Sequence, residues 1–138
     1  MALVPRQPAP PIAAVISFLD CINRGDLDGL AALMTDDDAL IVLEEPPLVG
    51  RKANFEAWNG YFTAFPSYVI HPRHIVSSRG TVAVLGTTTG SHLELPDEEE
   101  MKLDVIWVAE VVNGRLSRWR VAEDAPELRA EIGIPSNA

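Results

Sequence analysis

Two adjacent carboxylates, Glu44 and Glu45, stand between an apolar run at residues 39–43 and the prolines Pro46 and Pro47. Partial removal from water makes a carboxylate a better base near neutral pH, so an acid at the rim of an apolar cavity could abstract a proton next to a carbonyl group. An ordinary solvated strand end fits the same pattern, and the residues leave both interpretations open. Because neighbours alternate along a strand, we expect Glu45 to face the cavity and Glu44 to face solvent.

The three histidines offer imidazoles for proton transfer, but they do not suggest a metal site. His71, His74 and His92 show no recognisable ligand spacing with the acids, so we expect no bound metal. His71 and His74 cannot share one face of a regular strand unless Pro72 introduces a bulge. His92 and Thr88 share a face of an extended strand, so one of them would line a cavity and the other would lie at its rim.

The remaining acids and the single cysteine have ordinary structural interpretations. Asp124 precedes Ala-Pro-Glu, a pattern typical of the N-cap of a closing helix. Glu94 and residues 97–100 form an acidic loop, which is usually a solvated one. Cys21 lies in an apolar helical pattern and has no cysteine partner in the chain, which fits a buried side chain and a reducing compartment.

The spacing of apolar residues predicts three N-terminal helices. The first begins at Pro11 and ends at Gly25. Asp26 caps a short second helix, which residues 35–38 close as a solvated turn. The third spans residues 52–65, and its aromatic side lies at i, i+3, i+7 and i+10 (Phe55, Trp58, Phe62 and Phe65). Together with Tyr61, these rings would form core or cavity wall.

The second half of the chain alternates with a period of two and predicts strands. After a short strand at residues 39–43, we expect strands at 67–76, 81–93, 101–112 and 115–122, and a closing helix at 127–132. Asn113-Gly114 is a strong hairpin signal. Trp119 alternates with two arginines and is expected to be buried.

Helices followed by antiparallel strands predict an α+β domain, with three helices packed on one face of a curved antiparallel sheet around a cone-shaped cavity. The domain would span residues 11–134, with a flexible arm at 1–10 and a tail at 135–138. Of the 138 residues, 47% are hydrophobic and 22% are charged, as in globular proteins. The net charge of −9 argues against nucleic acid and anionic membranes as partners.

Several classes of function are not expected from the sequence. No run approaches the roughly 20 apolar residues that span a bilayer, so we expect a cytoplasmic protein. The sequence contains no Gly-rich phosphate loop, nucleophile elbow or Cys-His pair. We therefore expect no cofactor and no acyl-enzyme chemistry.

Residues 23–39, NRGDLDGLAALMTDDDA, resemble the first helix turn and the second helix of the ketosteroid isomerase and nuclear transport factor 2-like superfamily. Other segments resemble the SnoaL-like, polyketide cyclase branch of this superfamily. They are residues 86–90 (GTTTG), the Pro96 loop, residues 113–116 (NGRL), and Asp124 with residues 131–133 (EIG). The resemblance implies a cystatin-like, cone-shaped barrel with a deep apolar pocket, and a homodimer through the outer face of the sheet. This superfamily hosts isomerases, hydrolases, dehydratases, cyclases and binding modules, so the resemblance is less specific for function.

The resemblance also implies site positions. In the isomerases, a carboxylate at the end of the first strand and just before a proline is the general base, and Glu45 matches it. Phe18 stands where these enzymes have an oxyanion-binding Tyr, and Ile106 or Trp107 stands where they have an Asp. Because each missing donor costs about 10²- to 10³-fold in turnover, ketosteroid isomerisation is not expected.

Two other branches match in fragments. The cyclases place an acid on the same late strand, where Asp104 would need a strand bulge or an insertion to serve. Thr88 replaces the His often found in their Gly-Thr-x-Thr-Gly motif. The epoxide hydrolase branch has an acid shortly after Trp-Arg on the last strand, matched by Asp124. Its Arg and Asp companions have no clear equivalent in the sequence.

Two functions therefore stay open. One is a cofactor-free isomerase, cyclase or hydrolase that does acid-base chemistry on a small hydrophobic substrate, and the other is a non-catalytic ligand-binding or dimerisation module. The candidate catalytic residues are Glu45, Asp124 and His92. The candidate pocket residues are Phe18, Trp58, Tyr61, Phe62, Thr88, Asp104, Trp107 and Trp119.

Overall fold

Helix α1 (Pro11–Arg24) begins and ends where the sequence predicts. The computed structural model describes residues 10–138, so the predicted arm lies almost wholly outside the described residues. Pro11 occupies the first helical turn, where its missing N–H costs nothing, and Gly25 ends the helix in the left-handed conformation. The buried face of α1 packs across the sheet and consists of Ala14, Val15, Phe18, Leu19, Cys21 and Ile22.

Helix α2 (Leu27–Ala32) is capped as predicted, because the Asp26 carboxylate accepts the backbone N–H of Gly29 at 2.9 Å. The next segment corrects the sequence analysis. Residues 35–38 are not a solvated turn but part of strand β1 (Met34–Val42), and Asp38 is 1% exposed. Asp38 has the strand parity of Leu40, so its side chain turns inward although the acidic run suggested solvent.

Helix α3 (Arg51–Ala64) is tied to the first two strands by one buried amide. Asn54 Nδ2 donates to the carbonyls of Asp38, Leu48 and Gly50 at 3.0, 3.0 and 2.9 Å, which joins α3 to β1 and to the short strand β2 (Leu48–Val49). The predicted aromatic side of α3 is confirmed by Trp58, which is buried and meets Phe18 edge to face.

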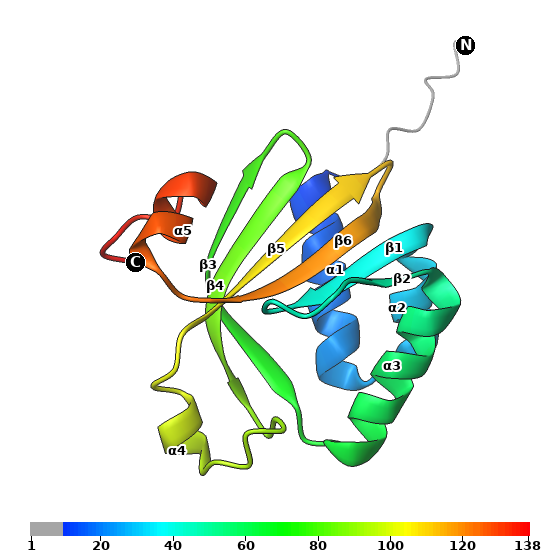
Figure 1. Ribbon diagram of the computed structural model, residues 1–138, viewed down its shortest axis with the longest axis horizontal. Coiled ribbons are helices and arrows are strands. Elements are labelled where there is room, and N and C mark those ends of the chain that lie inside the picture. The colour runs from blue at the N-terminus through cyan, green and yellow to red at the C-terminus, as the bar shows by residue number, and fades with distance from the viewer. Residues whose placement is uncertain (1–9) are drawn as a thin grey trace, which may run out of the picture.

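Six strands form one curved sheet in the order β2-β1-β6-β5-β4-β3 (Figure 1). Strands β3 (Val69–Ser78), β4 (Thr81–Thr89), β5 (Val105–Val112) and β6 (Arg115–Glu123) pair antiparallel, as predicted. Asn113 and Gly114 form the hairpin turn with φ of 51° and 79°. Strand β1 runs parallel to β6, which corrects the expectation of a wholly antiparallel sheet, and the sheet is not closed into a barrel.

The Pro72 bulge is present, as a register shift between Pro72 and His74. Opposite it, Gly86 lies so close to β3 that a Cβ atom there would collide with the His71 carbonyl oxygen. The ring of His71 hydrogen-bonds Thr89 Oγ1 at 2.9 Å. The bulge and the glycine thus bend the sheet at the end where the β4–β5 connection leaves it.

Each face of the sheet carries its own apolar cluster. Helices α1 to α3 cover the inner face, where Val82, Val84, Trp107, Ala109 and Trp119 are buried. Helix α5 (Pro126–Ile132) and Ile134 cover part of the outer face at Ala83, Leu85 and Ile106, and Figure 1 shows α5 apart from the other helices. The outer face, through which a homodimer is predicted, is therefore partly occupied by the chain itself.

The connection between β4 and β5, residues 90–104, differs most from the sequence analysis. Strand β4 ends at Thr89 rather than at residue 93, and β5 begins at Val105 rather than at 101. Gly90 makes the exit turn with φ of 68°, pressed against the Ser67 backbone. The connection contains the short helix α4 (Asp97–Glu100), which projects from the lower end of the sheet in Figure 1. Between residues 10 and 138, no helix is long and apolar enough to cross a membrane.

Candidate functional site

Two adjoining pockets lie between α3, the inner face of the sheet and the β4–β5 connection. The larger, here called the α4-side pocket, has a volume of about 590 Å³. The smaller, the α3-side pocket, has a volume of about 220 Å³. Five residues belong to the walls of both: Val42, Tyr61, Tyr68, His92 and Val121. The polar groups along this shared wall define the candidate site.

Tyr61 and His92 form a hydrogen-bonded pair on the shared wall. The Tyr61 hydroxyl lies 2.9 Å from His92 Nδ1 and accepts the His92 backbone N–H at 3.2 Å. The phenol oxygen has two lone pairs and can accept Nδ1–H as well as the backbone N–H, and in that arrangement Nε2 of a neutral imidazole carries no proton. Burial raises the pKa of Tyr61, so its hydroxyl stays protonated.

Tyr68 brings a second phenol to the same wall. Its ring centroid lies 4.9 Å from that of Tyr61, with the planes nearly perpendicular. Burial, followed by the neighbouring Tyr61 and Glu100, raises the pKa of Tyr68. Its hydroxyl is therefore a neutral hydrogen-bond donor over the whole working pH range. Two phenols and one imidazole thus meet where the two pockets adjoin.

A buried carboxylate supports this wall from behind. Glu100, the last residue of α4, is 1% exposed and accepts a short hydrogen bond from Thr88 Oγ1. Its other oxygen is 3.5 Å from the Ser91 backbone nitrogen. The acidic run at residues 97–100 was expected to be solvated, and Glu100 corrects that expectation. Because Thr88 and Ser91 line the α4-side pocket, Glu100 fixes the wall on which His92 follows.

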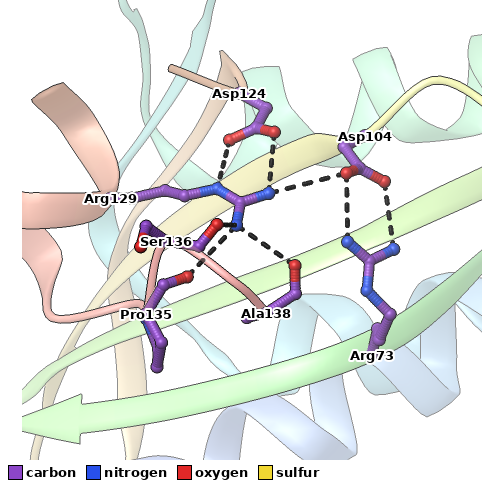
Figure 2. Close-up of polar contacts among 7 residues, drawn as sticks. All are labelled: Arg73, Asp104, Asp124, Arg129, Pro135, Ser136 and Ala138. Atoms are coloured by element: carbon purple, nitrogen blue, oxygen red, sulfur yellow. Dashed lines mark hydrogen bonds and ion pairs between the residues drawn. The ribbon is translucent and has the colours of Figure 1, made fainter. Parts of the chain in front are cut away.

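At the mouth of the α4-side pocket, two carboxylates are held by arginines. Asp124 accepts from Arg129 Nε and Nη2 at 2.7 and 2.8 Å, and Asp104 accepts from Arg73 Nη1 and Nη2, both at 3.0 Å. Figure 2 shows Arg129 between the two carboxylates. The distance from Arg129 Nη2 to Asp104 Oδ2 is 3.6 Å. Arg129 also donates to the carbonyls of the predicted tail, namely those of Pro135, Ser136 and Ala138.

The arginine contacts determine what these carboxylates can do. The Arg129 hydrogen bonds lower the pKa of Asp124, so it is ionised and a weak base. Asp124 is not the N-cap of α5, since that position is Ala125 and no side chain caps it. Arg129 from α5 and Asp104 from the end of the β4–β5 connection lie beside Asp124, a grouping of one arginine and two aspartates that the sequence did not reveal.

The structure brings together most of the predicted site residues. Seven of them line one or both pockets: Trp58, Tyr61, Thr88, His92, Asp104, Trp107 and Asp124. Phe18 and Trp119 lie in the core, 5.0 Å apart by ring centroids, and Phe62 packs on Trp58. His92 lines the site from the connection and not from a strand.

Glu45, the predicted general base, lies elsewhere. It is exposed in the turn after β1, where its backbone N–H bonds the Val42 carbonyl. Within residues 10–138, Glu45 is not among the residues that line either pocket. Its neighbour Glu44 faces a separate groove beside α5.

The sequence analysis missed Tyr68 and Glu100, as well as the two arginines at the pocket mouth, Arg73 and Arg129. Tyr68 has the same parity as the buried Ile70, and this alternation could have placed it on the inner face. Glu100 has no such signal, because it ends a run of four acids. Within the described part of the chain, no group of three or more His, Cys, Asp or Glu side chains is placed to hold a metal ion.

Solved structures share this architecture at low identity. An uncharacterised cystatin-fold protein from Novosphingobium aromaticivorans superposes with a TM-score of 0.70 and 16% identity, over 82% of this chain and 97% of that one. A protein named as a SnoaL-like polyketide cyclase from Jannaschia sp. CCS1 superposes with a TM-score of 0.69 and 17% identity, over 98% of this chain and 99% of that one. An LEH-like epoxide hydrolase from M. tuberculosis superposes with a TM-score of 0.65 and 17% identity, over 88% of each chain.

These similarities confirm the cystatin-like, nuclear transport factor 2-like fold. At the level of sequence, the model of the SnoaL-like domain matches residues 15–119, which is most of the chain and includes every element from α1 to the middle of β6. The chain therefore belongs to the SnoaL-like domain family.

Proposed function

We propose that this protein is an enzyme that moves a proton on a small, mostly apolar molecule, and that the Tyr61–His92 pair is the group that moves it. The observation that supports this most is the position of that pair, on the wall shared by two largely apolar pockets. An imidazole is the side chain best suited to accept and return a proton near neutral pH.

The surrounding groups suit a substrate with one polar oxygen. The neutral hydroxyl of Tyr68 can donate to a carbonyl or epoxide oxygen as negative charge develops on it. When Tyr61 accepts Nδ1–H of His92, Nε2 carries no proton and is the nitrogen that can take a proton from the substrate. His92 is also exposed, and it can therefore exchange its proton with water after each turnover.

Deuterium exchange tests this proposal directly. The protein would be incubated with neutral ketones in D₂O, and NMR would follow loss of the protons next to the carbonyl. We expect His92→Gln to lower the exchange rate by about 10² or more, because general acid-base groups contribute about 10²- to 10⁴-fold. His74→Gln, a matched histidine on β3, should leave the rate unchanged. Equal rates for wild type and His92→Gln would refute the role of the pair.

A second reaction is supported by the cluster at the pocket mouth. Asp104 and Asp124 both line the α4-side pocket and flank Arg129, and a relative of the same fold is named as an epoxide hydrolase. One of these carboxylates would take a proton from water as the water oxygen bonds to an epoxide carbon, while the ring C–O bond breaks and the Tyr68 hydroxyl gives a proton to the ring oxygen. In that case Asp124→Asn would abolish diol formation while His92→Gln would leave it largely intact.

The alternative is a module that binds an apolar ligand without reaction. It is favoured by the arginine contacts, which occupy the oxygens of both mouth carboxylates and lower the pKa of Asp124. Binding of ketones or epoxides, measured by Trp fluorescence, with neither exchange nor diol formation would establish this alternative. Trp58 and Trp107 line the pockets and would report the ligand.

A further inference from the structure

The two pockets present apolar surfaces on either side of one polar strip. In the α3-side pocket, the residues outside the shared wall are Leu40, Ala57 and Trp58, and none of them carries a charged or hydroxyl group. Tyr61, Tyr68 and His92 supply the hydroxyl and imidazole groups, and all three belong to the shared wall. A ligand group that hydrogen-bonds there would therefore leave apolar surface unfilled on the α3 side.

The α4-side pocket is also apolar next to the shared wall. Trp107 and Val105 line it towards the sheet, and Leu43, Leu93 and Leu103 line it towards solvent. Each of these three leucines is 47% exposed, which is unusual for large apolar side chains gathered at one opening. At the same opening Asp104 and Asp124 are paired with Arg73 and Arg129. Lys102, the one cation among the lining residues, lies 3.1 Å from Glu99, so a ligand carboxylate would meet no unpaired cation among them.

We propose that a single neutral ligand occupies both pockets, and that its hydrogen-bonding oxygen is internal, with hydrocarbon on both sides. The oxygen would meet the Tyr61, Tyr68 and His92 strip, one arm would fill the α3-side pocket, and the other would lie under the exposed leucines. This inference rests on the proposed function for the identity of the oxygen-binding groups. It adds the substrate class: internal ketones or epoxides rather than terminal ones, and neutral molecules rather than carboxylates.

The volumes set the length of the arms. A volume of 220 Å³ corresponds to roughly seven water-sized groups, so an arm of about four carbons fits beside the oxygen. A ligand whose oxygen lies near one end leaves the α3-side pocket almost empty, or forces a long arm into it. With the short arm on the α3 side, the longer arm has room in the 590 Å³ α4-side pocket, but its outer methylene groups lie beside leucines that are themselves 47% exposed and are only partly removed from water.

Two isomeric probes test this inference. In 5-nonanone the carbonyl is flanked by two butyl groups, whereas in 2-nonanone it is flanked by a methyl and a heptyl group, and the two ketones have the same composition. Isothermal titration calorimetry would give both dissociation constants. We expect 5-nonanone to bind about tenfold more tightly, from the loss of roughly two buried methylenes by its isomer.

A filled α3-side pocket provides the second measurement. Ala57→Phe should weaken 5-nonanone about tenfold and leave 2-nonanone within about twofold. Ala64→Phe, at an exposed position on the same helix, is the matched control and should change neither constant. Thermal unfolding would show that each variant is folded before binding is measured.

The outcomes separate this inference from the proposed function. Equal affinities for the two ketones, no measurable binding of either, or equal weakening of both by Ala57→Phe would overturn the two-pocket ligand. The expected preference for 5-nonanone, in a protein that shows no His92-dependent exchange, would support the ligand class and refute the catalytic proposal. His92-dependent proton exchange without a preference for 5-nonanone would support the catalytic proposal and overturn the two-pocket ligand.

Discussion

Replacing Asp38 with Asn should remove a pH dependence of stability that arises from one buried carboxyl group. Asp38 is 1% exposed, and among residues 10–138 no group donates a hydrogen bond to its Oδ1. Burial, and then the negative charge of Asp37, raise the pKa of Asp38 to about 7 against the opposing effect of the Ala39 backbone N–H.

The size of the effect follows from the difference between the folded and unfolded states. Aspartate in an unfolded chain has a pKa of about 3.9. Between about pH 4 and pH 7 the unfolded chain loses this proton while the folded protein keeps it, so the free energy of unfolding falls as pH rises. The contribution of Asp38 declines by about 1.4 kcal/mol per pH unit, or about 4 kcal/mol across the window. Above the folded pKa the decline ends.

Urea unfolding of wild type and Asp38→Asn between about pH 4.5 and pH 8 measures this contribution. The difference between the two curves cancels the other titrating groups. We expect Asp38→Asn to gain stability over wild type steadily with pH and to reach its full advantage near pH 8. Asp97→Asn, at an exposed position, is the control and should differ from wild type by a constant amount. Parallel curves for wild type and Asp38→Asn would refute the assignment of a proton to buried Asp38.

Two further predictions concern the groups that support the pocket. Glu100→Gln should lower the free energy of unfolding by about 1–3 kcal/mol, because Gln has one acceptor oxygen where Glu has two, so either Thr88 Oγ1 or the Ser91 N–H loses its buried partner. A double-mutant cycle with Thr88→Val should show coupling, and purely additive losses would argue against this contact. Arg129→Met should cost roughly 3 kcal/mol near neutral pH, because Asp124 is left ionised without its partner. That cost should shrink as pH falls below about 4, where Asp124 is protonated in the unfolded chain and progressively so in the folded protein, and acid titration followed by circular dichroism would show whether it does.

Local signals predicted much of the fold. The ends of α1 could be predicted because Pro11 and Gly25 act through their own backbone conformations. The β5–β6 hairpin could be predicted because Asn113 and Gly114 accept positive φ at both turn positions. The aromatic side of α3 could be predicted from spacing, because burial against the core selects one side of a helix.

The site could be predicted only in part, because its contacts join distant positions. Tyr61 and His92 are 31 positions apart, and their contact depends on the turn at Gly90, which ends β4 before the predicted strand does. The direction of β1 depends on pairing with β6 across most of the chain. Asp38 and Glu100 end acidic runs that indicate solvent by composition, and only the tertiary fold shows which member of each run is buried.

In the β4–β5 connection, the residues that attach it to the sheet differ from the residues that would contact a ligand. Glu100 attaches it to β4 through Thr88, whereas Leu93 and Leu103, which would touch a ligand, are exposed and add little to the stability of the core. Substitutions at such exposed positions usually change stability by less than about 0.5 kcal/mol. Ligand preference could therefore drift during evolution, or be redesigned in the laboratory, by exchanging this stretch while Glu100 and Thr88 are retained. A division of this kind helps to explain how one scaffold can come to serve many unrelated reactions.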